Sequence, residues 1–410
     1  MTPQRILYVC GGRNFRSAAP GQKIGGVVAC WRKSGHDVML VCGGDILGAD
    51  VAVPSYGAQE IHTKWYRRIS ALQPLVRSVS EYRDIVHDRL LLKHLETVAS
   101  QWAPTLVWER SSRLHGAGLF LAKRIGIPCV LEWKDHLIPY KVSAFRRRAE
   151  QLESFKNATA DGIVVESGVL RDNLAREGVP PEKILVAHNA VDADVFVRDA
   201  RHRVEQRKAL GVGDDEVLVG YLGSYAFYHD AVRLVLSAGI LRGCGIRGIR
   251  VLMVGGGEEY PRCRAAAEQM GLLGSQIIML PGVPAREVPA LLSSLDVAVL
   301  PGSTDIICPI KILEYMSAEL PTLAPDYPCN REVIRDGDTG MLFPPKDEHA
   351  LADRIRVLAG DTALRQRLGL RAREEVIGRY TWKKTWGAAL DEMLRRNGCL
   401  PPERDRLCAG

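Results

Sequence analysis

Residues 296–345 read DVAVLPGSTDIICPIKILEYMSAELPTLAPDYPCNREVIRDGDTGMLFPP. The segment DVAVLP is a short apolar run typical of a buried parallel strand, and STDIIC follows it as a loop. The segment PIKILEYMSA predicts a helix with Pro309 at the first helical position, where its missing N–H costs nothing. A strand, a loop and a helix in this order form one unit of a doubly wound α/β sheet.

Two charged side chains of this helix indicate a phosphate site. Lys311 and Glu314 are three residues apart, so they occupy neighbouring positions on one helix face. A helix N-terminus with a cation in its first turn is suited to a diphosphate. A carboxylate one turn further along can accept hydrogen bonds from the vicinal hydroxyls of a ribose. Together these features predict a nucleotide-diphosphate pocket without a P-loop.

Length and composition are those of a globular protein of about two domains, with 410 residues, 46% hydrophobic and 25% charged. The net charge of +7 suits anionic partners, but it is too dispersed to indicate nucleic acid. The ten cysteines form no C-x-x-C pair, so we interpret them as reduced, buried thiols. Neither a spanning apolar run nor a signal-peptide hydrophobic region is present, and the sequence predicts a cytoplasmic protein.

Alternating strands and helices occur in two successive series, which predicts two doubly wound domains with a hinge within residues 192–213. Ligands of such sheets bind at the carboxyl ends of the strands, so we expect the site in the interdomain cleft. The segment TWKKTWGAALDEMLRR, near the end of the chain, predicts an amphipathic helix.

The run PIKILEYMSAELPTLAPD, with the later NREVIRDGDTGMLFPPKDEHALADRI, resembles the donor site of retaining GT-B glycosyltransferases of family 4. More narrowly, the chain resembles a bacterial subset with a "SPLKLFEYMA" helix, and the resemblance covers nearly the whole chain. It implies the α/β GT-B fold, in which two Rossmann-like domains face an interdomain cleft and a C-terminal helix crosses back to the N-terminal domain. The expected parts are an acceptor-binding domain (1–193), a nucleotide-sugar-binding domain (194–379), the crossing helix (380–396) and a tail (397–410).

The resemblance implies that Glu314 holds the ribose. Many relatives carry an E-x7-E motif whose second glutamate matches Glu314, but the first falls on Ile306, which cannot do that work. Asp305, one residue earlier, either replaces that glutamate or is an ordinary loop carboxylate, and backbone groups are a further alternative. The transferred sugar therefore stays open. The backbone expected to face the diphosphate and sugar is that of Ile307, Cys308, Pro309 and Ile310.

The loop GSYAFYHD, residues 223–230, replaces a loop that carries an arginine and a lysine in many relatives. The matching positions are Ser224 or Ala226, and His229. His229 partly matches the "WHG" of the bacterial subset, and it is either a phosphate ligand or a residue of a helical turn. Because a neutral imidazole is a weak phosphate ligand, we expect Lys311 to supply the missing charge.

Glycine-rich loops complete the expected donor site. The segment GGRNFRSAAPGQKIGG, residues 11–26, predicts a basic loop whose final Gly25 and Gly26 match the double glycine of the family. A mobile surface loop is the alternative. The other expected backbone contacts of the donor are Gly223, Ser224, Gly256, Gly282 and Val283.

Charged residues follow two apolar strands of the first half, in WERSS and LEWKDH, and resemble the "YERSS" and "LEVN" segments of the same subset. We expect Arg110, Glu132, Lys134 and His136 to line the acceptor side. The alternative is an Arg–Glu ion pair that joins the strands.

The sequence thus predicts a retaining hexosyltransferase that moves a sugar from a nucleotide-diphosphate donor to a glycan or lipid-linked acceptor, in bacterial surface polysaccharide or glycoconjugate synthesis. Lys311, His229 and Asp305 are the expected catalytic residues, with no metal and no other cofactor. The alternatives are a catalytically impaired nucleotide-sugar-binding protein and another enzyme on the same fold, such as a sugar-nucleotide epimerase or a phosphorylase. The basic run Arg146–Arg148 and the cluster at residues 65–68 indicate either peripheral contact with the inner face of the cell membrane or a solvated helix face.

Overall fold

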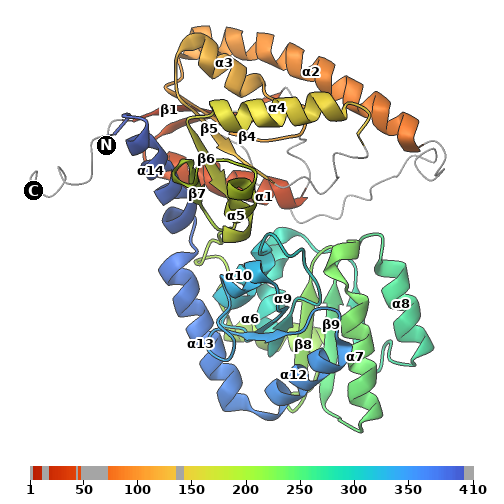
Figure 1. Ribbon diagram of the computed structural model, residues 1–410. Helices are drawn as coiled ribbons and strands as arrows, with labels where there is room; N and C mark the ends of the chain where they lie inside the picture. Colours follow the sequence, from red (N-terminus) through yellow and green to blue (C-terminus); the bar gives the residue numbers. More distant parts are fainter. Residues whose placement is uncertain (1–2, 12–17, 43–44, 48–72, 135–142, 401–410) are drawn as a thin grey trace, which may run out of the picture. The chain divides into compact units, whose positions relative to one another are not determined.

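The computed structural model describes residues 3–11, 18–42, 45–47, 73–134 and 143–400, which form two compact units (Figure 1). One unit contains the described residues up to His188 together with those from Trp386 onward, and the other contains Asn189–Thr385. The boundaries expected from the sequence, after residues 193 and 379, lie a few residues from these positions.

The first unit is built on a seven-stranded sheet in the order β3-β2-β1-β4-β5-β6-β7. All neighbouring strands are parallel except β3, which is antiparallel to β2 at the edge. The inner strands are buried almost throughout, as expected for a parallel sheet with helices on both faces. The strands are β1 (Arg5–Cys10), β2 (Asp37–Cys42), β3 (Asp45–Leu47), β4 (Leu106–Arg110), β5 (Cys129–Glu132), β6 (Gly162–Val165) and β7 (Ile184–Val186).

Helices cover both faces of this sheet, with α2, α3 and α4 above it in Figure 1 and α1 below it. Glu109 and Asp88 accept backbone N–H bonds at the start of α3, and Gly126 ends α3 in the left-handed conformation. The helices are α1 (Ala18–Lys33), α2 (Gln73–Trp102), α3 (Ala117–Ile125), α4 (Arg146–Thr159), α5 (Gly168–Arg176) and the short η4 (Pro181–Lys183).

Gly25 and Gly26 lie inside α1, so the expectation that they end a loop is wrong. The helix begins at Ala18, inside the segment 11–26 that was expected to be a loop, and its buried residues pack on the sheet. The rest of the predicted basic loop, residues 12–17, lies outside the described residues.

The C-terminal helix belongs to the first unit, as predicted. After the π-helical turn η7 (Lys383–Gly387), α14 (Ala388–Arg396) packs its buried face there. Trp31 of α1 donates its indole N–H to the Trp386 carbonyl at 2.9 Å, and the rings of Trp31, Trp108 and Trp386 form edge contacts.

The second unit contains a fully parallel six-stranded sheet in the order β10-β9-β8-β11-β12-β13, over one large apolar core. The strands are β8 (Val217–Leu222), β9 (Ile249–Val254), β10 (Ile277–Leu280), β11 (Val297–Val299), β12 (Thr322–Pro325) and β13 (Met341–Phe343).

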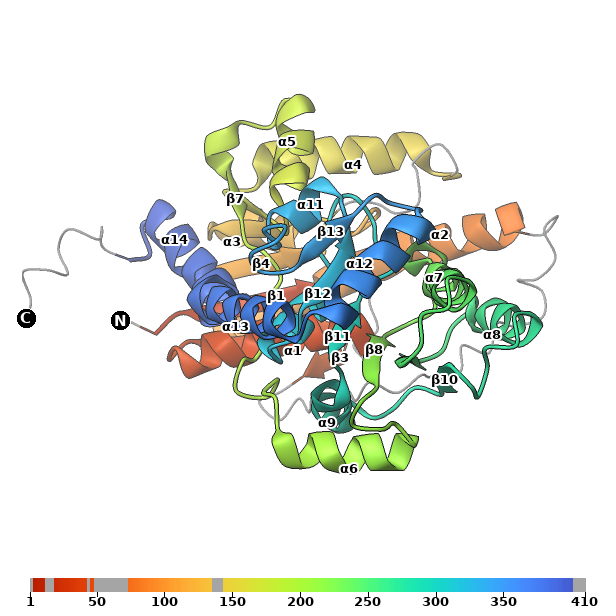
Figure 2. The same ribbon diagram turned by 90° about the horizontal axis from the view of Figure 1, so that it is seen from below.

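The helices of the second unit also divide between the two faces: α7, α8 and α12 pack together on one, and α6 and α9 on the other (Figure 2). This is the arrangement that right-handed crossovers produce in a doubly wound sheet. The helices are α6 (Ala200–Leu210), η5 (Phe227–His229), α7 (Val232–Gly243), α8 (Tyr260–Gln269), η6 (Ala285–Glu287), α9 (Val288–Ser294), α10 (Ile310–Ser317), α11 (Pro328–Arg331), α12 (Glu348–Gly360) and α13 (Thr362–Arg379).

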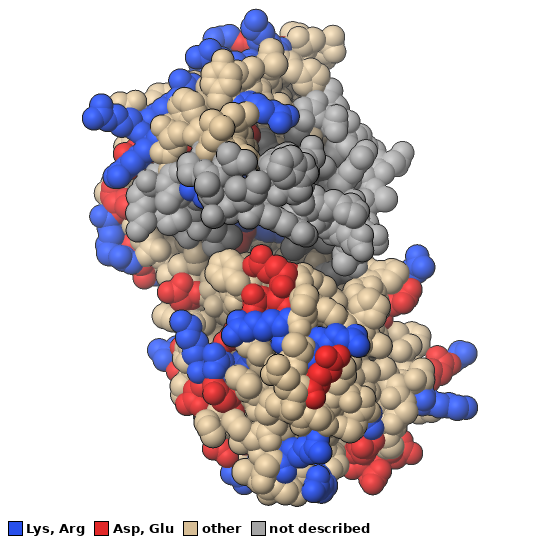
Figure 3. All heavy atoms as spheres, turned by 90° about the vertical axis from the view of Figure 1, so that its right-hand side faces the viewer, with Lys and Arg blue, Asp and Glu red and all other residues tan. Residues whose placement is uncertain are grey.

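The surface of the second unit is charged (Figure 3), and most of the described cysteines are buried. On the face in Figure 3, acidic and basic side chains are interspersed over the second unit. All described cysteines are free, and most are buried, although Cys244 is exposed and therefore corrects the expectation that every thiol is buried. Among the described residues, no helix combines the length and apolarity needed to cross a membrane.

Candidate active site

The strand order of the second unit reverses between β8 and β11. The chain runs from β8 outward to β9 and β10, and then returns to β11 on the opposite side of β8. In open α/β sheets, a crevice forms at such a switch point, outside the carboxyl ends of the two strands. The predicted loop 223–230 follows β8 and the predicted loop STDIIC, residues 303–308, follows β11, so both lie at this edge.

Glycines allow the loops at this edge to approach closely. The Gly223 N–H donates to the Val254 carbonyl at 2.9 Å, and a Cβ on Gly255, which has φ +143°, would overlap the Gly223 carbonyl. A Cβ on Gly302 would lie 2.9 Å from the His229 backbone. The loops after β8, β9 and β11 therefore pack backbone against backbone.

Gly223, Gly255 and Gly302 form a glycine floor at this edge of the sheet, and Lys311 extends from the first turn of α10 toward Gly223. A Cβ on Gly223 would overlap the Lys311 Nζ atom, which also lies 3.1 Å from Nε2 of His229 and 5.2 Å from the centre of the Tyr221 ring. Lys311 is half-buried and forms no ion pair with a carboxylate of the described residues. Burial lowers the pKa of Lys311 to about 8, and the nearby Glu314 opposes this shift. A half-buried ammonium without a salt-bridge partner is suited to an anionic ligand.

His229 is a partner of Lys311 rather than an open phosphate ligand. It is buried, and its Nδ1–H donates to the Gly302 carbonyl at 3.3 Å. This hydrogen bond leaves a lone pair on Nε2 to accept from Lys311. Burial, together with the Lys311 charge, lowers the pKa of His229 to about 2, so the imidazole is neutral at physiological pH.

The helix α10 is fixed to the end of β8. The Tyr315 hydroxyl donates to the Leu222 carbonyl at 2.9 Å and accepts from the Leu222 N–H at 3.0 Å. Pro309 is the N-cap of α10 instead of its first helical residue, since its ψ of 144° is extended. Asn189 donates its amide to the Cys308 carbonyl at 2.9 Å, which holds the segment before the helix.

The carboxylates of this region differ in exposure. Glu314, on α10, is 3% exposed, whereas Asp305 is exposed in the loop that precedes the helix. Ile306, Ile307 and Ile310 are half-buried beside it. The structure thus brings Lys311 and His229 together. Asp305 lies at an accessible position in the loop between β11 and α10.

The remaining predicted donor residues follow neighbouring strands at the same edge. Ser224 and Gly282 are exposed, and Val283 is half-buried. The Gly256 carbonyl accepts from the Tyr225 N–H at 2.9 Å, and the Ser224 carbonyl accepts from the Tyr221 hydroxyl at 2.5 Å.

In the first unit, the expected acceptor residues Arg110 and Glu132 form a buried ion pair of 2.5 Å across β4 and β5. Glu132 is fully buried, and its carboxylate also accepts from Tyr8 at 2.5 Å and from Lys23 at 2.9 Å. Lys23 additionally pairs with Glu166. The ion pair that joins the strands, the alternative left open by the sequence, is therefore present.

The charges of this cluster compensate one another. Burial alone would raise the pKa of Glu132, but Arg110 and Lys23 lower it to about 2. Tyr8, Lys23 and Glu166 were not predicted as partners. Tyr8 and Glu132 lie in the buried apolar strands ILYVC and VLE, and Glu166 directly follows the strand IVV. A polar residue within or just after a buried apolar strand is the sequence signal that could have identified these three residues.

Of the last two expected acceptor residues, only Lys134 is among the described residues. Lys134 is half-buried, and its charge helps to lower the pKa of the buried Glu166, after that of Lys23. His136 lies outside the described residues. In the described part of the chain, no three His, Cys, Asp or Glu side chains gather as a metal site would require.

Two family models match the chain in sequence order. Residues 19–190 match the glycosyl transferase 4-like domain, and residues 202–375 match the glycosyl transferases group 1. The chain belongs to the group 1 glycosyl transferases. Together the two matches extend over both units, and the predicted membership in this enzyme family is confirmed.

Curated relatives of this glycosyltransferase include mannosyltransferases. It is 25% identical, over 88% of each chain, to a GDP-mannose-dependent alpha-mannosyltransferase of Mycobacterium tuberculosis. It is 26% identical, over 77% of its length and 84% of the relative, to a GDP-mannose-dependent alpha-(1-6)-phosphatidylinositol monomannoside mannosyltransferase of Mycolicibacterium smegmatis.

Solved glycosyltransferase structures share the fold. A glycosyltransferase from Rickettsia africae has a TM-score of 0.73 at 15% identity, covering 97% of this chain and 99% of that one. The Anabaena protein Alr3699/HepE in complex with UDP has a TM-score of 0.73 at 17% identity, covering 96% and 100%. The predicted GT-B fold is confirmed.

Proposed function

We propose that this glycosyltransferase transfers mannose, with retention of configuration, from GDP-mannose to a hydroxyl of a glycan or lipid-linked acceptor. The observation that carries the proposal is the half-buried Lys311 ammonium at the switch point of the second sheet, which forms no salt bridge with a carboxylate of the described residues. The mannosyl donor is supported by the two GDP-mannose-dependent relatives that span most of the chain.

Different donor-site residues would bind different parts of the nucleotide. Lys311 and the N-terminus of α10 would bind the diphosphate, because both place positive charge at the same point. Glu314, one helical turn further, would accept hydrogen bonds from the ribose hydroxyls. The glycine floor at residues 223, 255 and 302 would let the ligand approach the backbone closely.

The chemistry we propose is stabilisation of the leaving group. The bond from the anomeric carbon to the β-phosphate oxygen breaks, and its electron pair stays on that oxygen, where Lys311 stabilises the negative charge. The acceptor hydroxyl attacks the same face of the sugar, and its proton passes to the leaving phosphate. Neutral His229 would hold the Lys311 ammonium in position through its Nε2. We propose that this transfer needs no bound metal, so excess EDTA should leave it intact.

We propose that the acceptor binds at the carboxyl edge of the first sheet, near its own switch point between β1 and β4. Arg110 ends β4 at this edge, and the Lys23–Glu132–Glu166 cluster fixes the ends of β5 and β6 beneath it.

Peripheral membrane contact is supported by an exposed apolar stripe on α2. Its side chains are spaced by three or four residues, so they share one face of the helix, and each is at least 38% exposed. The exposed Arg146–Arg148 run begins α4 beside this helix, since Glu81 of α2 accepts from the Ala144 N–H at 2.9 Å. Basic side chains beside an apolar stripe suit an anionic bilayer. The stripe consists of Leu75, Val79, Tyr82, Val86 and Leu90.

The proposal is tested by incubating the full chain with GDP-mannose and a panel of other nucleotide sugars, with proton NMR of the anomeric signal. We expect consumption of GDP-mannose and a first-formed product of α configuration. Glu314→Ala should reduce consumption, whereas Glu268→Ala, at an exposed position of α8, should not. If no nucleotide sugar is bound or consumed, or if the first product is β, the proposal is wrong.

A further inference from the structure

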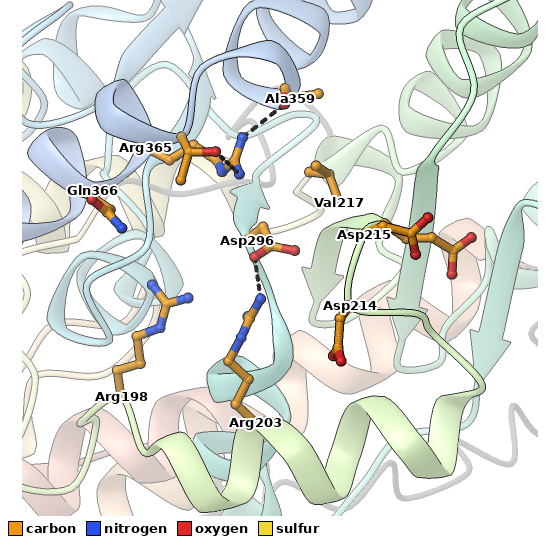
Figure 4. Close-up of a pocket in the computed structure, with 11 residues that line it drawn as sticks. Arg198, Arg203, Asp214, Asp215, Val217, Asp296, Ala359, Arg365 and Gln366 are labelled. Atoms are coloured by element: carbon orange, nitrogen blue, oxygen red, sulfur yellow. Dashed lines mark hydrogen bonds and ion pairs between the residues drawn. The ribbon is translucent and has the colours of Figure 1, made fainter.

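The second unit contains a cavity that the proposed function does not use. It measures about 530 Å³ and lies at the amino ends of β8 and β11 (Figure 4). Val217, the first residue of β8, and Asp296, which directly precedes β11, both line it. Its size falls within the roughly 300–1,000 Å³ of small-molecule sites. The remaining walls come from the segment before α6, from α6 itself, from the loop 214–216, from the end of α12 and from the start of α13.

One wall of the cavity is rich in arginine. Arg203 donates to Asp296 at 2.6 Å, but the same carboxylate also pairs with Arg207 at 2.9 Å. Arg365 donates to three neutral oxygens, those of Leu358, Ala359 and Thr362. Asp296 is thus shared between two guanidinium groups and Arg365 pairs with no carboxylate of the described residues, so part of the positive charge of this wall is uncompensated.

Arg198 is the arginine most available to a ligand. Its side chain is half-buried, and its guanidinium makes no hydrogen bond or ion pair with any residue that the structure describes. Burial, reinforced by the guanidinium groups of Arg203 and Arg365, lowers the pKa of Arg198, and the carboxylates of Asp296 and Glu319 oppose this shift. In Figure 4, Arg198 and Arg365 extend from different elements toward the same space.

The opposite wall is acidic, and the lining contains no aromatic ring. Asp214 and Asp215 lie across the cavity from Arg198, and neither forms an ion pair within the described part of the chain (Figure 4). Carboxylates accept hydrogen bonds from hydroxyl groups, whereas a nucleoside base would be expected to meet an aromatic or broad apolar surface. Val217 and Ala359 are the apolar side chains of the lining.

We propose that this cavity binds the phosphate monoester of a polyol, such as a sugar phosphate. The phosphate would lie against Arg198, Arg203 and Arg365, and the hydroxyls would face Asp214 and Asp215. Bidentate contacts from guanidinium groups match the geometry of a phosphate.

This site is separate from the donor site. The donor residues follow the carboxyl ends of β8 and β11, and the cavity lies at their amino ends. Six residues of β8 span roughly 20 Å, so one small ligand cannot occupy both places. A nucleotide and a polyol phosphate should therefore bind at the same time.

The test is isothermal titration calorimetry of the full chain with glucose 6-phosphate, inorganic phosphate and glucose as probes, repeated with saturating GDP. We expect glucose 6-phosphate to bind more tightly than phosphate, glucose not to bind, and GDP not to compete. Arg198→Gln should weaken binding of glucose 6-phosphate by roughly tenfold to a hundredfold, as expected for a lost charge-assisted contact.

Arg247→Gln is the matched control, because Arg247 is exposed, precedes β9 at the same sheet edge and does not line the cavity. This variant should bind the probe like the wild type, and thermal melting of both variants should confirm that they fold. The proposal is overturned if glucose 6-phosphate does not bind, if Arg198→Gln binds it unchanged, or if GDP displaces it. Equal affinity for phosphate and glucose 6-phosphate would refute the role of the acidic wall.

Discussion

The Nζ atom of Lys311 lies 3.1 Å from Nε2 of His229, and the other ring nitrogen of His229 is held by the Gly302 carbonyl. The loop after β11 therefore orients the imidazole, and the imidazole orients the lysine. No carboxylate of the described residues pairs with Lys311, so its charge is available to a ligand. This arrangement places a positioned cation at the switch point of the second sheet.

Binding of GDP should weaken above pH 8. The pKa of Lys311 is about 8 in the folded protein, so the ammonium that binds the diphosphate is lost as the pH rises through this value. Affinity should be nearly flat from about pH 7, where the terminal phosphate of GDP is mostly ionised, to pH 8, and it should fall by up to about tenfold per pH unit above pH 8. The GDP affinity of Lys311→Arg should not fall above pH 8 in the same calorimetric titrations, since a guanidinium stays charged. An unchanged wild-type affinity at pH 9.5 would exclude Lys311 as the diphosphate ligand.

His229 should make the fold sensitive to acid. Its pKa is about 2 when folded and 6.5 in the reference state, so between these values the unfolded chain binds a proton that the folded chain does not. Stability should therefore fall with decreasing pH, by about 1.4 kcal/mol per pH unit from this group.

Comparison with His229→Gln isolates that contribution. The glutamine does not titrate, so the variant should lose less stability than the wild type between pH 6.5 and 4 in urea unfolding curves. Parallel pH dependence of the two proteins would show that the imidazole is not buried in its neutral form.

Gly223→Ala should displace Lys311 without unfolding the protein. The added Cβ overlaps the Lys311 Nζ atom, which is the far end of a flexible side chain and can move. We expect GDP affinity to fall by roughly tenfold, as for a weakened charge-assisted bond, with a melting temperature near that of the wild type.

Gly255→Ala provides the contrast for that variant. Its Cβ meets the Gly223 backbone at a φ of +143°, so it should cost roughly 1–3 kcal/mol of stability. Wild-type GDP affinity in Gly223→Ala would contradict the placement of Lys311 over this glycine.

Lys23→Met should strongly destabilise the first unit. Lys23 is 3% exposed and pairs with both Glu132 and Glu166, so its loss leaves two carboxylates in a buried site. Breaking such a buried pair costs roughly 3–5 kcal/mol. Lys33→Met, on the exposed side of the same helix, should change the free energy of unfolding by less than about 0.5 kcal/mol. Similar effects of the two substitutions would refute the structural role of the cluster.

Much of this architecture follows from local patterns, and the donor helix shows why. The positions of Lys311 and Glu314 depend on helical spacing and on a strand that precedes the helix, both of which are visible in the sequence. The assignment of Pro309 to the first helical position was wrong by one residue, because the choice between N-cap and first turn depends on ψ.

The features that the sequence did not reveal depend on distant residues. Lys23 is 109 positions from Glu132 and 143 from Glu166, so no local pattern links them. Whether His229 meets a phosphate or Lys311 likewise depends on the loop around Gly302, 73 positions away. The start of α1 was misplaced because a double glycine usually breaks a helix, whereas here it lies within one.

The most direct test of the central claim, that Lys311 binds a diphosphate at the switch point of the second sheet, is calorimetric binding of GDP and guanosine to Lys311→Met. The account predicts that the variant binds GDP roughly tenfold to a hundredfold more weakly than the wild type, and guanosine equally well, because only the diphosphate meets the ammonium. GDP affinity equal to that of the wild type would contradict it.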